Sequence, residues 1–224
     1  MTPLRRHDLA YLHADARVEF ATRSLPEAAE RWVSQWLADG RPLVVCRQRM
    51  RENGAESDVD LGICLPNHLG RQKLACRVRS AAVARVERPI SVEQLNGVLQ
   101  SEACSAMTRL AGAAQPLGVS VGVYGSTAWE CLSGASYRRS ESDIDLICDV
   151  AQRDTLPAWL RALQRSAQDV DGRLDGEVRF PDGKAVAWRE LSNAHESGGT
   201  ARVMYKGLRD VGFASLDALL AGMQ

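Results

Sequence analysis

The chain has 224 residues, of which 45% are hydrophobic and 25% charged, and its 28 basic residues are balanced by 28 acidic ones. It can therefore bury a substantial core, but it is less basic and poorer in aromatic residues than a typical nucleic-acid-binding protein. Charge interrupts every apolar run within residues 1–20, and no later stretch approaches eighteen apolar residues. We therefore expect neither a signal peptide nor a membrane span, no nucleic-acid or membrane partner, and a cytoplasmic location.

The predicted elements of the first 90 residues are one helix and several short strands. Residues 24–40 begin with Ser24 and Glu27 at the spacing of a capping box and end at Gly40, which predicts a capped helix. Four apolar or alternating runs predict strands, which cover residues 42–47, 59–65, 73–79 and 82–87. We therefore predict a small, mostly β N-terminal domain over residues 1–90.

After this point helices and strands alternate, which is typical of an α/β arrangement. Residues 91–118 predict a helix, with a capping box at Ser91 and Gln94. A strand, a helical turn, a strand, a helix and a hairpin turned on Asp182-Gly183 then follow, over residues 119–124, 126–132, 143–150, 153–168 and 173–191. The predicted fold class is thus α+β or α/β, with a mixed sheet flanked by helices over residues 91–224.

Charge is distributed unevenly along the chain. Residues 1–90 carry 15 basic and 11 acidic residues, and residues 41–88 alone carry 10 and 5. Such a cluster is either an ordinary solvated strand face or a surface for phosphates or for an acidic protein.

Two stretches of the chain share one pattern, SDVDLGICL at residues 57–65 and SDIDLICDV at residues 142–150. Alternate residues of a strand share a face, so each pattern predicts two carboxylates side by side. The first pair, Asp58 and Asp60, has no Gly-Ser turn and no helix start upstream. We interpret it as an ordinary strand with a polar outer face.

The second pair, Asp143 and Asp145, follows the segment VYGSTAWE. Here a strand delivers Gly125 and Ser126 into the start of a helix, where unpaired N–H groups and the positive end of the helix dipole favour a phosphate. Mg²⁺ or Mn²⁺ prefers carboxylate oxygens and substrate phosphates, and it offsets the repulsion between the two acids. The sequence therefore predicts a metal site at Asp143 and Asp145.

A third carboxylate on a later strand would complete this site. Asp175 is the first choice and Glu177 the alternate, because both lie on the polar face of the strand predicted after residue 173. Such an acid could bind the metal and also accept the proton of an attacking hydroxyl. A polar outer face of a hairpin is the alternative explanation for both residues.

Four basic residues are further candidates for phosphate contacts. Arg138 and Arg139 lie in the loop before the second Asp pair, and Lys184 and Lys206 are two of only three lysines in the chain. Each of them could equally be a solvated surface residue.

These residues carry a resemblance to known families. The Gly125-Ser126 turn, the Asp143-Ile144-Asp145 strand and a later acid, in an α/β order, resemble the nucleotidyltransferase superfamily. The runs RRHDLAYL, VYGSTAWECLSG, SESDIDLICDV and LDGEVRFPDGKAVAWREL resemble, nearly end to end, the phosphoribosyl-dephospho-CoA transferase family of the malonate decarboxylase system, also called malonate decarboxylase holo-acyl carrier protein synthase.

The resemblance implies a nucleotidyltransferase-like catalytic domain over residues 91–224, with Asp143 and Asp145 as active-site aspartates. It implies transfer of the prosthetic group from 2′-(5″-triphosphoribosyl)-3′-dephospho-CoA to a serine of the apo acyl carrier subunit, with release of diphosphate. Two alternatives stay open. One is a nucleotidyltransferase that uses ATP or CTP on a small molecule, protein or RNA, and the other is a non-catalytic nucleotide-binding or scaffolding module.

Overall fold

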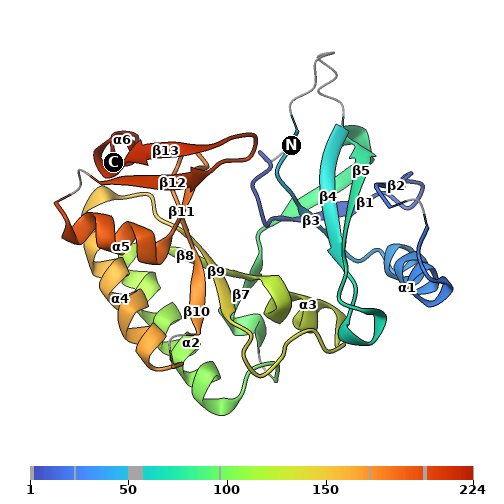
Figure 1. The fold of residues 1–224 in the computed structure, drawn as a ribbon, viewed down its shortest axis with the longest axis horizontal. Coiled ribbons are helices and arrows are strands. Elements are labelled where there is room, and N and C mark those ends of the chain that lie inside the picture. The colour runs from blue at the N-terminus through green and yellow to red at the C-terminus, as the bar shows by residue number, and fades with distance from the viewer. Residues whose placement is uncertain are drawn as a thin grey trace.

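The computed structural model describes residues 3–22, 24–49, 58–95, 97–171, 173–198 and 201–223. Strands of these segments form two sheets, a β-rich first part and a second, mixed sheet flanked by helices (Figure 1). The predicted α+β class is therefore confirmed. No helix within the described ranges is long and apolar enough to span a membrane.

The first sheet is antiparallel, with the strand order β2-β5-β4-β3-β1-β6. Helix α1 (Glu27–Ala38) buries Ala29, Val33 and Trp36 in the core of this sheet. The spacing of these residues is that of one helical face. The strands are β1 Leu9–Leu12, β2 Glu19–Phe20, β3 Leu43–Val45, β4 Asp58–Cys64, β5 Lys73–Arg79 and β6 Val83–Glu87.

The helix predicted over residues 24–40 forms, but its capping box does not. Helix α1 follows Pro26 as N-cap residue, and no side chain of the described segment caps it. Proline at a helix start is favourable because its φ angle is already helical, whereas the residue before a proline avoids the helical conformation. The prediction that Ser24 caps the helix is therefore wrong.

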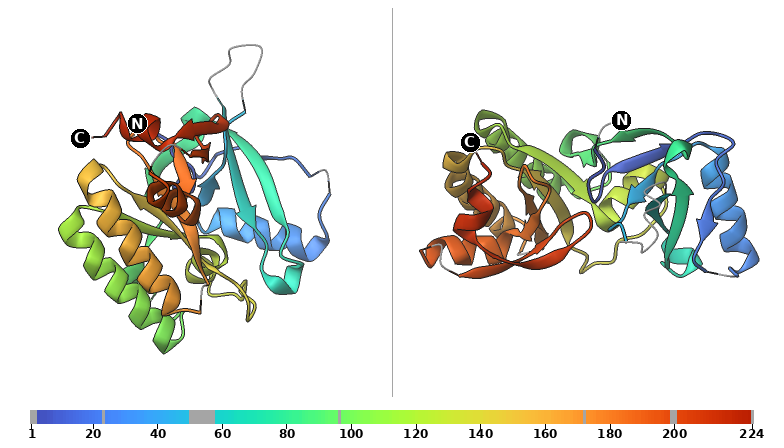
Figure 2. Two further views of the ribbon diagram at one scale, coloured as in Figure 1. Left: turned by 60° about the vertical axis from the view of Figure 1, so that its left-hand side comes forward. Right: turned by 90° about the horizontal axis from the view of Figure 1, so that it is seen from above.

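The second sheet has the order β13-β12-β11-β10-β9-β8-β7, and β9 and β10 form its parallel pair. Helix α4 provides the crossover connection that a parallel pair needs. Figure 2 shows α2 and α4 side by side against this sheet. The strands are β7 Ile90–Ser91, β8 Ser120–Tyr124, β9 Ile144–Asp149, β10 Leu174–Arg179, β11 Ala185–Ala187, β12 Arg202–Lys206 and β13 Val211–Ser215. The helices are α2 Ser101–Ala114, α3 Gly125–Ser133, α4 Leu156–Gln168, α5 Trp188–Glu196 and α6 Leu216–Leu220.

The helix predicted over residues 91–118 is shorter in the structure. The backbone N–H of Ser91 does donate to Oε1 of Gln94 over 2.9 Å. This contact opens a single 3₁₀ turn, Val92–Leu95, and α2 begins only at Ser101. Gly97 adopts a φ of 83°, which no α-helix continues through, so the capping pattern marks a turn.

The hairpin predicted over residues 173–191 is also shorter. Strand β11 ends at Ala187, and Trp188 begins helix α5. Trp188 and Leu191 are both buried at the i, i+3 spacing of a helix. The helical period therefore prevails over the strand pattern at the end of this segment.

Helix α3 and the loop after it join the two sheets (Figure 1). Trp129 and Tyr137 are buried in the core of the first sheet, although they follow β8 of the second. The ring of Trp129 lies 5.6 Å from that of Trp36, and the hydroxyl of Tyr137 donates to the carbonyl oxygen of Cys64 over 2.9 Å. These contacts pack the first sheet against α3 and the loop that follows it.

Candidate active site

Neighbouring strands of the second sheet bring the predicted acids together. Asp145 in β9 is in register with Asp175 in β10 on one side and with Tyr124 in β8 on the other. Paired residues of adjacent strands point to the same face, so the two carboxylates are neighbours. Asp143 lies one residue before β9 begins, at the same end of the sheet.

Gly125 lies directly against Asp145. It has a φ of +70°, and a Cβ atom built on it would stand 1.9 Å from Oδ2 of Asp145. Any side chain at this position would therefore be strained and would collide with the carboxylate. The Gly-Ser turn and the Asp pair, far apart in the sequence, thus form one compact unit.

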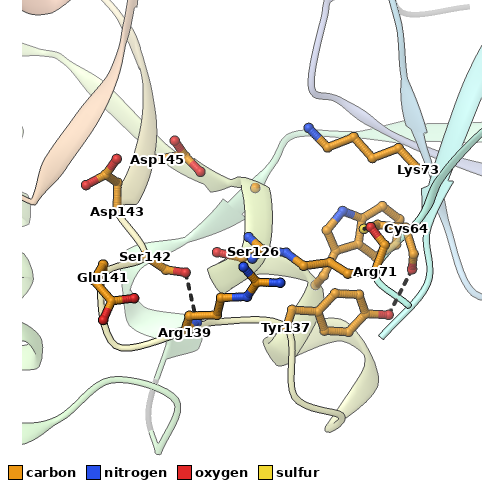
Figure 3. A pocket seen from close by; sticks show the side chains of 12 residues that line it. Cys64, Arg71, Lys73, Ser126, Tyr137, Arg139, Glu141, Ser142, Asp143 and Asp145 are labelled. Carbon is orange, nitrogen blue, oxygen red and sulfur yellow. Dashed lines mark hydrogen bonds between the residues drawn. The ribbon is translucent and has the colours of Figure 1, made fainter. Parts of the chain in front are cut away.

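A cavity of about 430 Å³ opens beside this unit (Figure 3). Five of the predicted site residues line it, namely Gly125, Ser126, Arg139, Asp143 and Asp145. Asp143 and Asp145 lie on one side of the cavity, and Ser126 lies between them and the cationic residues. The structure therefore brings the core of the predicted site together.

The first part of the chain contributes cavity residues that the sequence patterns did not predict. Arg71 and Lys73 line the same cavity, and so does Cys64. Arg71 and Lys73 belong to the basic cluster of residues 41–88, and Lys73 is the one lysine of the chain not predicted to contact phosphate. The cluster was compatible with a surface for phosphates, but the sequence could not show that Lys73 lies near Asp145.

Electrostatic repulsion characterises the acidic side of the cavity. Burial, then the nearby charges of Asp175 and Asp143, raise the pKa of Asp145 to about 6, and Lys73 opposes this shift. Within the described part of the chain, neither Asp143 nor Asp145 forms a side-chain ion pair. A carboxylate in this position is stabilised by any cation that enters the cavity.

The donor set suits a hard divalent cation bound together with a substrate. Across the described segments there is no ready-made group of three or more His, Cys, Asp or Glu side chains that could hold a metal. Mg²⁺ is commonly bound by one or two carboxylates plus substrate phosphates rather than by an all-protein cage. Asp143 and Asp145 in an open cavity fit this mode of binding.

The structure separates the two candidates for the third acid. Asp175 is exposed and adjoins Asp145, whereas Glu177 is 4% exposed. Glu177 accepts hydrogen bonds from Arg6 at 3.0 Å and from Lys206 at 2.9 Å. Burial alone would raise the pKa of Glu177, but the hydrogen bond with His7 and the nearby cations hold it well below its usual range. The charge of Glu177 is thus neutralised by cations of the protein. Lys206, a predicted phosphate contact, forms an ion pair with Glu177 and does not line the cavity.

Two other predicted phosphate contacts lie outside the cavity lining. Arg138 donates to Glu130 over 2.6 Å and to a backbone carbonyl group. Lys184 forms an ion pair with Asp182 at 2.7 Å. The contacts of both side chains are with nearby protein groups, which explains their positions without a phosphate ligand.

The first Asp pair has different surroundings. Asp58 and Asp60 of β4 are in register with Arg79 and Arg77 of β5. The ion pairs measure 3.7 Å for Asp58 with Arg79 and 3.1 Å for Asp60 with Arg77. The interpretation of this strand as one with an ordinary polar outer face is confirmed.

A second, mainly apolar cavity of about 390 Å³ adjoins the first and shares Lys73, Gly125 and Asp145 with it. Its wall includes His7 and Tyr124, whose rings stack at 3.9 Å between centroids. The combined space has a charged end beside the carboxylates and an apolar end between the sheets. It is suited to a substrate with a phosphorylated part and an uncharged part.

The cavity brings carboxylates and cations from both parts of the chain around one space, which suits an anionic substrate. Family models match both parts of the chain: the phosphoribosyl-dephospho-CoA transferase MdcG N-terminal domain matches residues 5–89, and the MdcG C-terminal domain matches residues 89–216. The chain belongs to the phosphoribosyl-dephospho-CoA transferase family.

Curated relatives carry the same name. A phosphoribosyl-dephospho-CoA transferase of Xanthomonas axonopodis pv. citri (strain 306) is 32% identical over 205 residues, which cover 92% of this chain and 91% of the relative. That of Bradyrhizobium diazoefficiens is 30% identical over 216 residues, which cover 93% and 89%. No solved structure matches the chain significantly.

Proposed function

We propose that the protein transfers the phosphoribosyl-dephospho-CoA group of 2′-(5″-triphosphoribosyl)-3′-dephospho-CoA to a serine of the apo acyl carrier subunit of malonate decarboxylase, in the cytoplasm. The observation that carries the proposal is the contact between Gly125 and Asp145, because it joins a phosphate-binding helix start to a pair of carboxylates. The family to which the chain belongs supplies the identity of the transferred group.

The reaction follows the chemistry of phosphoryl-centre displacement. The serine oxygen forms a bond to the α-phosphorus, the bond from that phosphorus to the diphosphate oxygen breaks, and the serine proton leaves. Ser126 and the N–H groups at the start of α3 bind the departing diphosphate. Asp175, next to Asp145, accepts the serine proton.

Asp143 and Asp145 hold Mg²⁺ or Mn²⁺ in this proposal. When bound, such an ion supplies positive charge to the phosphate oxygens and lowers the pKa of the attacking hydroxyl. Asp145, whose pKa is raised to about 6, is ionised at neutral pH and ready for a cation. The protein is thus a metal-dependent nucleotidyltransferase in mechanism.

The acceptor is a protein, and the first part of the chain is suited to meet it. Residues 41–88 carry 10 basic and 5 acidic residues. Complementary charge accelerates encounter with an acidic partner such as an acyl carrier subunit.

The test is incorporation of the prosthetic group into purified apo carrier subunit, followed by intact mass. With Mg²⁺ and the triphosphoribosyl donor we expect the mass of the carrier to increase by one prosthetic group, and with EDTA we expect no increase. ATP and CTP, offered as alternative donors, should give no product. Transfer from ATP or CTP, without transfer from the triphosphoribosyl donor, would contradict the proposed substrate and support a different nucleotidyltransferase.

A further inference from the structure

Three cationic side chains face the cavity opposite the carboxylates. Arg71 comes from the loop before β5, Lys73 is the first residue of β5, and Arg139 comes from the loop between α3 and β9. Figure 3 shows the guanidinium groups of Arg71 and Arg139 close to each other beside Ser126, while Lys73 enters from the same side as Arg71 and points toward Asp145. The cavity is therefore lined by cations from both parts of the chain.

The surroundings of these cations differ from those of their neighbours on β5. Arg77 and Arg79 on the same strand form ion pairs with carboxylates of β4. As far as the structure describes the chain, no carboxylate forms an ion pair with Arg71, Lys73 or Arg139. Carboxylates are near two of them, because Arg139 adds to the lowering of the pKa of Glu141 by the Ser140 hydrogen bond, and Lys73 opposes the rise that burial causes in the pKa of Asp145. Since none of the three cations is neutralised by a direct ion pair, the arrangement favours an anionic ligand.

Hydrogen bonds hold the two cation-bearing loops together. The backbone N–H of Asn67 donates to the carbonyl oxygen of Ser136 over 2.9 Å, and the side chain of Asn67 donates to the carbonyl oxygen of Arg138 over 3.3 Å. Arg71 itself has a φ of +54°, which a residue other than glycine rarely adopts. These hydrogen bonds hold the two loops next to each other, so that Arg71 and Arg139 both line the cavity.

The positions of the charged side chains around the cavity indicate which kind of anion could bind there. Asp143 and Asp145 lie on one side of the cavity, Arg71 and Lys73 enter from the other, and Ser126 lies beside the guanidinium groups of Arg71 and Arg139. Three cations that line one cavity match the several negative charges of linked phosphates better than the charge of a single phosphate.

We propose that Arg71, Lys73 and Arg139 bind the polyphosphate tail of the donor, so that the first part of the chain supplies part of the active site. The ligand class is a linear polyphosphate, and its identity as the diphosphate that leaves rests on the proposed function. Lys73 lies beside Asp145 and binds the tail near the reacting phosphorus, whereas Arg71 and Arg139 bind its far end.

The test measures binding of inorganic tripolyphosphate in the presence of Mg²⁺ by isothermal titration calorimetry, without donor or carrier. We expect Lys73→Met to weaken binding about tenfold and Arg71→Met with Lys73→Met about a hundredfold, as expected when charge-assisted hydrogen bonds are lost. Lys73→Arg keeps the charge and should bind within about threefold of wild type. The matched control is Arg161→Ala, which removes an exposed cation from α4 and should leave binding unchanged.

Lys73 is an exposed residue of β5, so its variants should unfold at the temperature of the wild type, which a thermal melt checks. Wild-type protein that does not bind tripolyphosphate, or a Lys73→Met variant that binds it equally well, would overturn the inference. Weakened binding in the variants, combined with no transfer from the triphosphoribosyl donor, would leave the polyphosphate site standing and defeat the proposed function alone.

Discussion

The two Asp-x-Asp strands of this protein have nearly the same sequence and opposite environments. Asp58 and Asp60 lie opposite arginines of β5 and form ion pairs with them. Asp145 lies between Tyr124 and Asp175 on the neighbouring strands, and burial and like charge raise its pKa to about 6. A strand motif therefore acquires its chemistry from the residues that its neighbours present. Four experiments test this comparison.

The largest effect is expected for removal of one charge from each pair. Asp145→Asn should lower the rate of prosthetic-group transfer by about a thousandfold, on the scale seen when one charge-stabilising group of a preorganised site is removed. Asp60→Asn should leave the rate within about twofold, because Asp60 is neutralised by Arg77, away from the cavity. Intact mass of the carrier over time measures both rates. Equal losses in the two variants would show that the pairs are not functionally distinct.

A smaller loss of transfer rate is expected when Gly125, which lies against Asp145 of the second pair, is replaced. Gly125→Ala should lower the transfer rate about a hundredfold, because a Cβ atom 1.9 Å from the Asp145 carboxylate must displace it. Gly134→Ala is the control, since Gly134 also has a positive φ of 72° but no atom within 4 Å of its built Cβ. Both variants should lose about 1 kcal/mol of stability from backbone strain, measured by urea unfolding. Only Gly125→Ala should lose activity beyond about twofold.

Variants of the two candidates for the third acid, Asp175 and Glu177, should differ in whether they lose activity or stability. Asp175→Asn should slow transfer about thirtyfold with little change in stability, because Asp175 is exposed beside Asp145. Glu177→Gln should cost about 2 to 3 kcal/mol of unfolding free energy, because it removes the buried charge that partly buried cations such as Arg6 contact. Single-turnover rates and urea unfolding distinguish the two. The opposite pattern would assign the third acid to Glu177.

The smallest expected effect is on the free energy of unfolding, measured in EDTA, which should change in opposite directions in Asp145→Asn and Asp60→Asn. At pH 8, Asp145→Asn should stabilise the protein by about 1 to 2 kcal/mol, because it removes a buried, repelled charge. Asp60→Asn should destabilise it by about 0.5 to 1 kcal/mol through loss of a partly exposed ion pair.

The stability difference between Asp145→Asn and wild type should depend on pH, because the pKa of Asp145 is raised in the folded protein. Folded wild-type protein holds the Asp145 proton up to about pH 6, whereas the unfolded chain releases it near the ordinary aspartate pKa of 3.8. Wild type therefore loses stability as the pH rises from about 4 to about 6, and the advantage of Asp145→Asn should be absent at pH 4 and complete above pH 7. Urea unfolding at several pH values checks this. A constant difference across this range would contradict the pKa assignment.

Local patterns in the sequence identified several parts of the site. The Gly125-Ser126 turn before a helix distinguished the second Asp pair from the first, and alternation placed Asp175 on a strand that could adjoin it. Both depend on interactions within a few residues, such as strand alternation and the start of a helix, which a single segment encodes. The same logic failed at Ser24, where the steric effect of Pro26 on its neighbour outweighed the capping pattern.

The sequence by itself therefore determined the fold class, the order of most elements and the residues at the acidic side of the cavity. Tertiary structure alone decided that Glu177 is bound by Arg6 and Lys206, and that Lys73 of the first sheet reaches the cavity of the second. The physical reason is that the charge and exposure of these side chains depend on partners more than 25 residues away. Sheet register and the packing of α3 bring such partners together, and neither is encoded in any one segment.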